Sequence, residues 1–127
     1  MLSGKKVAIT GALGGIGLPL LKHLDSLGAQ LLALDITDSQ SAQKLLAENN
    51  LSSVAYQQLD ITDEKAVSNF ATTTLSKESP SSLVNLAAKV VSGNLIDQKT
   101  ADLKSTFETN VIGQILISNV FVQFWIK

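Results

Sequence analysis

The chain of 127 residues contains no cysteine and a single histidine, His23. The absence of cysteine excludes disulfide bonds, thiolate nucleophiles and cysteine-based metal sites. One histidine does not make a metal cluster by itself, and the neighbours of His23 place it on the polar side of a helix, where we expect it to be solvated. We therefore predict that the chain holds no metal.

An excess of charge of one sign is also missing. The formal net charge is −1, with acidic and basic residues interspersed, so the chain lacks the basic surface that nucleic-acid binding requires. No signal peptide precedes the first apolar segment. The apolar stretch from Val111 to Trp125 is interrupted by polar residues and is shorter than the roughly 20 residues of a membrane span, which favours a buried or interface helix. We expect a soluble, cytoplasmic protein that binds neither nucleic acid nor membrane.

What the chain does contain is an alternation of apolar strands and amphipathic helices. Apolar runs predict four strands, at residues 6–10, 31–35, 54–59 and 83–88, and the apolar pattern of the fourth extends to Val91. Helical periodicity predicts helices at 16–27, 39–48 and 62–76, and a long final helix from Ala101 onward. This alternation predicts an α/β fold with a parallel sheet covered on both faces. Right-handed crossovers then give a three-layer, doubly wound (Rossmann) sheet of order 3-2-1-4.

A glycine-rich segment from Thr10 to Gly17 reads T-G-A-L-G-G-I-G and lies between the first strand and the first helix. A turn in this position brings backbone N–H groups and the helix N-terminus toward a phosphate, and glycine permits the close approach. The segment is not a P-loop, because no Lys-Ser or Lys-Thr pair follows Gly17. Taken alone it predicts a nucleotide site, and a glycine-rich turn without a ligand stays open as the alternative.

Two aspartates stand where predicted strands end. Asp35 follows Gly17 at about the distance expected of the acid that accepts from the adenosine ribose hydroxyls. Its carboxylate would repel a 2′-phosphate, and no Arg or Lys lies in the glycine-rich turn or just after Asp35, so the sequence favours NAD over NADP. Asp60 is placed to accept from the adenine amino group. Both aspartates also fit an alternative role as cap or turn residues.

Five motifs follow one another along the chain: Thr10-Gly11-x-x-x-Gly15-x-Gly17, Asp35, Leu59-Asp60-Ile61-Thr62, Leu83-Val84-Asn85-Leu86-Ala87-Ala88 and Asn110-Val111-x-Gly113. Together these motifs resemble the short-chain dehydrogenase/reductase family over essentially the whole chain. The resemblance implies a dinucleotide site built from residues along the whole chain: Gly11, Gly15 and Gly17 at the pyrophosphate, a backbone contact from Ile16, Asp35 at the ribose, Asp60 at the adenine, and Asn85 and Ala87 at the edge of the pocket. It also implies that Asn110 is an accessory catalytic residue, which kinks its helix and holds a water in the proton relay. The alternative for Asn110 is a polar residue on a solvated helix face.

The sequence departs from the family pattern in two places. Leu86 and Ala88 replace the second Asn and the Gly of the family's Asn-Asn-Ala-Gly, so we expect a loop that approaches the cofactor less closely. The family's catalytic Ser and Tyr-x-x-x-Lys, which would follow Asn110, are absent, and the single tyrosine, Tyr56, lies in the third predicted strand with Asp60 four residues on.

The departures lead to one hypothesis and one alternative. We hypothesise that residues 1–127 are a truncated NAD-binding Rossmann domain that stops after the helix following strand 4. Such a domain is the cofactor-binding portion of an oxidoreductase that transfers hydride between nicotinamide and a carbonyl or hydroxyl substrate, and it is inactive by itself. The alternative is a non-catalytic nucleotide-binding or dimerisation module, since strand 4 would be a sheet edge and the last helix would expose apolar surface. Either feature predicts a homo-oligomer.

Overall fold

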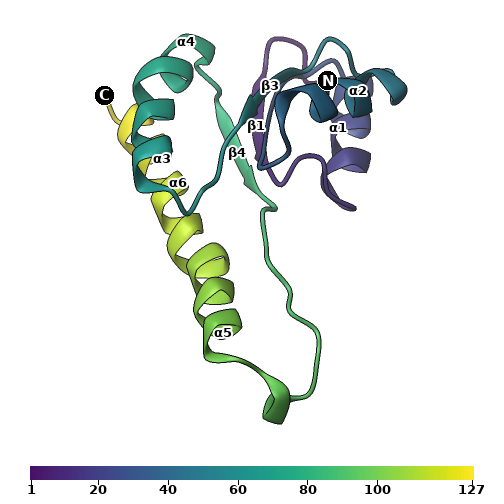
Figure 1. The fold of residues 1–127 in the computed structure, drawn as a ribbon. Coiled ribbons are helices and arrows are strands. Elements are labelled where there is room, and N and C mark those ends of the chain that lie inside the picture. The colour runs from purple at the N-terminus through teal and green to yellow at the C-terminus, as the bar shows by residue number, and fades with distance from the viewer.

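The computed structural model describes residues 1–127 and contains one parallel sheet of four strands, in the order β3-β2-β1-β4 (Figure 1). The strands are β1 (Lys6–Thr10), β2 (Gln30–Asp35), β3 (Ala55–Gln58) and β4 (Ser82–Asn85). Central β1 pairs with β2 on one side and with β4 on the other. The predicted α/β class and the strand order 3-2-1-4 are confirmed.

The helices follow the predicted alternation. The first two are α1 (Gly17–Ser26) and α2 (Ser39–Glu48). The third is α3 (Glu64–Phe70), which continues through the π-helical segment η1 (Ala71–Leu75) into α4 (Ser76–Glu78). After a short 3₁₀ turn, η2 (Leu95–Asp97), the last helix consists of α5 (Thr100–Phe107), the π-helical segment η3 (Glu108–Gly113) and α6 (Gln114–Trp125).

Two apolar cores cover the two faces of the sheet, because successive side chains of a strand point to opposite faces. Val7 and Ile9 of β1 pack with Leu21 of α1 and Leu46 of α2. On the other face, the alternate residue Ala8 belongs to a core formed by α3 and α6. That second core is closed by aromatic side chains, with the rings of Phe70 and Phe121 6.0 Å apart. The three predicted layers are therefore present.

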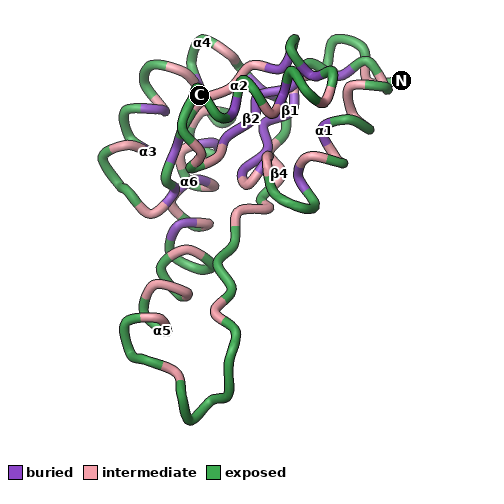
Figure 2. Tube along the Cα trace, turned by 45° about the vertical axis from the view of Figure 1, so that its right-hand side comes forward, coloured by how far each residue is buried: buried purple, intermediate pink, exposed green.

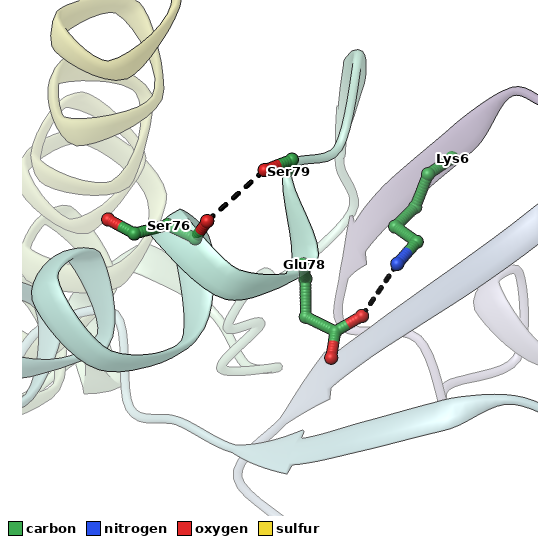
Figure 3. A network of polar contacts seen from close by, with 4 residues as sticks. All are labelled: Lys6, Ser76, Glu78 and Ser79. Carbon is green, nitrogen blue, oxygen red and sulfur yellow. Dashed lines mark hydrogen bonds and ion pairs between the residues drawn. The ribbon is translucent and has the colours of Figure 1, made fainter.

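An ion pair joins the amino-terminal edge of the sheet to the end of α4 (Figure 3). The Lys6 Nζ atom lies 2.7 Å from Glu78 Oε2, and each side chain is 24% exposed. Beside it the Ser79 hydroxyl donates to the carbonyl oxygen of Ser76 at 3.2 Å, where the chain leaves α4. These contacts fix the connection that leads into β4.

The prediction that the fourth strand reaches Ala88 or Val91 is wrong, since β4 ends at Asn85. The partner strand β1 ends at Thr10, and the chain then turns away at Gly11, which has a φ of +62°. Leu86 N–H still donates to the carbonyl oxygen of Thr10, but beyond it no strand backbone is available for pairing. Apolar residues after Asn85 therefore continue as a loop.

The last helix is present as predicted, and its apolar residues are divided between the core and the exposed surface. Figures 1 and 2 show that α5 and the loop before it project beyond the sheet, whereas α6 packs on the sheet beside α3. Phe121 is fully buried, yet Phe107 is 64% and Ile115 61% exposed. None of the helices combines the length and apolar character that crossing a membrane would require.

Candidate functional site

A cleft of about 620 Å³ lies at the carboxyl ends of the strands. Its lining comes from five segments that are far apart in the sequence: Thr10, Gly11 and Gly14, residues 34–36 after β2, residues 59–62 after β3, residues 86–89 after β4, and Ser105, Glu108 and Thr109 of the last helix. Four of the predicted site residues, Gly11, Asp35, Asp60 and Ala87, are brought together here.

The other predicted residues lie outside the lining of the cleft. Gly15 and Ile16 are exposed in the glycine-rich turn, and Gly17 is buried at the start of α1. Asn85 is turned toward the last helix, where its Nδ2 atom donates to the Ser118 hydroxyl at 3.0 Å. Asn110 lies in η3 and contacts the loop after β4. The cleft is thus assembled from fewer of the predicted residues than the sequence motifs suggest.

The glycines of the turn have different surroundings. A Cβ atom on Gly17 would lie 2.3 Å from the carbonyl oxygen of Gly11, and one on Gly11 would lie 2.7 Å from the backbone nitrogen of Ala87. Both distances are too short for a side chain, so Gly17 is required by the packing of the turn itself and Gly11 by its contact with the loop after β4. A Cβ atom on Gly15 would meet nothing within 4 Å. Open space beside Gly15 is what a backbone that approaches a ligand requires.

Thr10 holds the loop after β4 against the glycine-rich turn. Its side chain is fully buried, and its hydroxyl oxygen accepts from the backbone N–H groups of Leu86 and Ala87, each at 3.2 Å. No role for this side chain was predicted from the sequence motifs. The signal that was available is a hydroxyl at the last position of an otherwise apolar, buried strand, because a buried polar group requires a partner.

The Asp35 carboxylate joins the glycine-rich turn to the loop after β2. Its Oδ2 atom accepts from Leu13 N–H at 3.0 Å. Its Oδ1 atom accepts from the backbone N–H of Thr37 at 3.2 Å and from the Thr37 hydroxyl at 2.9 Å. Since each carboxylate oxygen has two acceptor positions, one position on Oδ2 remains, and rotation of the Thr37 hydroxyl would release a second. The residue therefore acts in a turn, as the alternative held, and also faces the cleft.

Asp60 combines the same two features. Its Oδ1 atom accepts from the Thr62 backbone N–H at 2.9 Å and from the Thr62 hydroxyl at 2.7 Å. Its Oδ2 atom makes no hydrogen bond within the chain, and the residue lines the cleft. A free acceptor is therefore available at the end of β3.

The last helix holds the loop after β4 through two side-chain amides. Asn110 Oδ1 accepts from Lys89 N–H at 2.7 Å, and Asn110 Nδ2 donates to the Lys89 carbonyl oxygen at 2.8 Å. One turn further on, Gln114 Nε2 donates to the carbonyl oxygen of Ala87, while Gln114 Oε1 is buried without a partner. Asn110 lies in η3, and short π-helical insertions of this kind are frequent at functional sites.

Carboxylates dominate the electrostatics of the cleft. Asp35, Asp60 and Glu108 line it, and Lys89 is the one cationic residue in the lining. Lys89 forms no ion pair within the chain. An added phosphate near the aspartates would meet repulsion, whereas neutral hydroxyl and amino groups would find acceptors. No group of three or more acidic or histidine side chains is placed to hold a metal ion.

Comparison with known proteins identifies relatives across nearly the whole chain. The family profile described as short chain dehydrogenase matches residues 5–127. The 2,3-dihydroxy-2,3-dihydro-p-cumate dehydrogenase of Pseudomonas putida is 27% identical over 124 residues, which cover 95% of this chain and 48% of that protein. A short chain dehydrogenase/reductase, notP′, of Aspergillus versicolor is 27% identical over 128 residues, covering 92% and 42%. The chain thus spans about half the length of the curated relatives it matches.

Solved structures give the same picture of the fold. A citronellol catabolism dehydrogenase of Pseudomonas aeruginosa superposes with a TM-score of 0.82 at 25% identity, over 96% of this chain and 51% of that one. The similarity therefore covers the sheet of four strands and its helices, together with the loops that form the cleft.

Proposed function

The chain belongs to the short-chain dehydrogenase family, and from this premise we propose that residues 1–127 form a dinucleotide-binding portion that takes NAD in preference to NADP. The observation that carries the proposal is the Asp35 carboxylate, which lines the cleft while hydrogen-bonded to Leu13 of the glycine-rich turn. An acid joined to such a turn supports ribose recognition next to a pyrophosphate.

The residues present fit a dinucleotide. The open space at Gly15 suits the pyrophosphate, and the backbone of Gly11, Ile16 and Gly17 completes the turn around it. Asp35 retains an acceptor for a ribose hydroxyl, and the free Oδ2 atom of Asp60 suits the adenine amino group. These matches support a role for each residue at the carboxyl ends of the strands.

The loop after β4 and the last helix complete the proposed site. Ala87 forms part of the cleft wall, and Asn85 supports it from behind through Ser118. The bound nicotinamide would supply hydride transfer with a carbonyl or hydroxyl substrate. We assign Asn110 an accessory role, since its side chain shapes the loop at Lys89. A polypeptide of residues 1–127 has no Tyr-x-x-x-Lys motif after Asn110, and we propose that it does not turn over by itself.

Calorimetry with NAD and with NADP tests the proposal. We expect NAD to bind and NADP to bind at least about tenfold more weakly, because a 2′-phosphate would meet the carboxylate of Asp35. The absence of NAD binding, or a preference for NADP, would overturn it. The inactivity is tested separately by mixing the protein with NADH and a panel of carbonyl compounds, where oxidation of NADH would contradict it.

A second candidate function, dimerisation, is favoured by the last helix. Residues 114–126 carry no charged side chain, and Ile112, Ile115, Val122 and Trp125 are each 44% to 61% exposed. In addition, β4 pairs with β1 only, which leaves its other edge unpaired. Exposed apolar surface of this extent and a free strand edge both favour association.

Sedimentation velocity tests this second candidate. A dimer that is weakened by Ile115→Lys is expected if the helix forms the interface. Val90→Lys is the matched control, because Val90 is 84% exposed but lies in the loop before η2. A monomer at every concentration tested would count against dimerisation, and a dimer unaffected by Ile115→Lys would point to the β4 edge.

A further inference from the structure

Tyr56 lies outside the cleft and reaches the loop that carries Asp35. It stands on β3 opposite Ala33 of β2, and its ring packs against the core beneath α1 and α2. Its hydroxyl lies within hydrogen-bond distance of two carbonyl oxygens, that of Asp35 at 3.1 Å and that of Thr37, which share its single proton. One side chain therefore holds both ends of the turn that follows β2.

The rest of that turn is held from the same strand. Gln58 Nε2 donates to the carbonyl oxygen of Ile36 at 3.1 Å, and Leu59 N–H donates to that of Asp35 at 2.8 Å. Three successive carbonyl groups, at residues 35–37, thus accept hydrogen bonds from β3 or from the residue after it. The turn cannot shift relative to β3 without breaking several of these bonds.

The side-chain oxygens of Asp35 are fixed from the other direction. They accept from Leu13 N–H and from Thr37, so the carboxylate is held between the glycine-rich turn and the turn that Tyr56 anchors. A shift of Thr37 would move the donors on Oδ1 and change which acceptor positions face the cleft. Burial, with the nearby charges of Asp35 and Asp38, raises the pKa of Tyr56 to about 12, so its hydroxyl remains a donor well above the neutral range.

We propose that Tyr56, assisted by Gln58, is a positioning residue that sets the Asp35 carboxylate for recognition of the 2′-hydroxyl of an adenosine ribose. The inference rests on the proposed function and adds a residue that the cleft itself does not contain. According to this inference, the preference for a ribose over a 2′-deoxyribose depends on residues of β3 as well as on Asp35.

The test compares two ligands that differ in one hydroxyl, adenosine 5′-monophosphate and its 2′-deoxy form. Dissociation constants are measured for the unmodified protein and for Y56F, which keeps the ring and removes the donor. Q58L is the second variant, and Q57L is the matched control. Gln57 neighbours Gln58 on β3, but its amide contacts Gln58 and Thr74 rather than the turn.

We expect the unmodified protein to favour the ribo form by about tenfold or more, since a hydrogen bond to a carboxylate is at stake. Y56F should reduce this ratio by about threefold or more, Q58L should reduce it in the same direction, and Q57L should leave it within about twofold. An unchanged ratio in Y56F overturns the inference, because a general loss of stability would weaken both ligands equally.

Failure of the proposed function would look different. If the unmodified protein binds neither nucleotide, nor NAD, then ribose recognition and the role of Tyr56 in it are both rejected. Amide hydrogen exchange in the free protein still decides whether Tyr56 holds the turn. Faster exchange of Thr37 N–H in Y56F, with Q57L unchanged, supports that contact, and equal exchange rejects it.

Discussion

Asn110 pairs with both backbone polar groups of Lys89 through its side-chain amide, at 2.7 and 2.8 Å, although the two residues are 21 positions apart. The amide thus makes the two hydrogen bonds that a neighbouring strand would make, with a loop that lies beyond the end of β4. The π-helical segment η3 lines the cleft through Glu108 and Thr109, and the pairing joins it to Lys89, which lines the same cleft.

Replacing Asn110 by alanine is expected to loosen this loop. Both residues are exposed and water can replace part of the lost interaction, so the free energy of unfolding should fall by only about 1 kcal/mol. The local effect should be larger, with faster amide exchange at Lys89. Asn119→Ala is the control, since Asn119 bonds to Gln123 within α6. Equal exchange at Lys89 in the two variants would argue against the pairing.

Asp35→Asn is expected to change the preference between NAD and NADP. The variant removes the negative charge that repels a 2′-phosphate and exchanges one acceptor for a donor. The ratio of the two dissociation constants should shift toward NADP by about tenfold. Asp63→Asn removes the same charge at the N-terminus of α3, outside the cleft, and serves as the control. A similar shift in both variants would mean that net charge alone sets the preference.

Gly15→Ala and Gly17→Ala should separate ligand binding from folding. A methyl group at Gly17 would collide with the backbone of Gly11 and Ala12, so the free energy of unfolding should fall by about 3 kcal/mol. A methyl group at Gly15 meets open space, and stability should change by less than about 1 kcal/mol while NAD binding weakens. Urea unfolding and calorimetry measure the two effects. If the Gly15→Ala variant bound NAD with full affinity, the pyrophosphate would not bind at this part of the turn.

The ion pair between Lys6 and Glu78 should contribute measurably to stability. A double-mutant cycle with Lys6→Met and Glu78→Gln is expected to give a coupling free energy of about 1 kcal/mol, because the pair is short and partly buried. The exposed pair of Lys44 and Glu48, at 4.0 Å, is the internal comparison and should give about 0.3 kcal/mol. Equal coupling energies in the two cycles would contradict the structure.

Titration of Tyr56 should reveal the constraint on its hydroxyl. The pKa rises from 10.0 to about 12 on folding, so the stabilisation is complete below pH 10 and is lost as the pH rises through 12. Tyr56 is the single tyrosine, and its ultraviolet absorbance therefore reports this ionisation directly. The free energy of unfolding should fall more steeply over this range in the unmodified protein than in Y56F. A midpoint near pH 10 in the folded protein would show that the hydroxyl is free.

The sequence predicted the parts of the site that depend on position along a strand. Asp35 and Asp60 follow apolar runs, and the carboxyl ends of parallel strands share one edge of the sheet, so their approach to one cleft follows from the strand order. The partners of these side chains did not follow in the same way. Leu13 is 22 residues from Asp35, and the contact depends on the path of the glycine-rich turn.

The loop after β4 was mispredicted for the same reason, because its contacts depend on segments that are distant in the sequence. Its apolar residues fit a strand, and only the end of β1 and the turn at Gly11 show why pairing stops at Leu86. The contacts of Asn110 and Gln114 with this loop depend on how the last helix packs. A π-helical insertion leaves no periodic signal that distinguishes it from a regular helix.

The hydroxyl of Thr10 and the backbone of Leu86 are joined across 76 positions of the chain. Such a separation makes closure of this contact entropically costly, whereas β1 and β2 pair over a short connection. We therefore expect the cleft to be completed late in folding, after the first three strands have associated. A dinucleotide added during refolding should then accelerate no early phase in stopped-flow fluorescence and should stabilise only the final state.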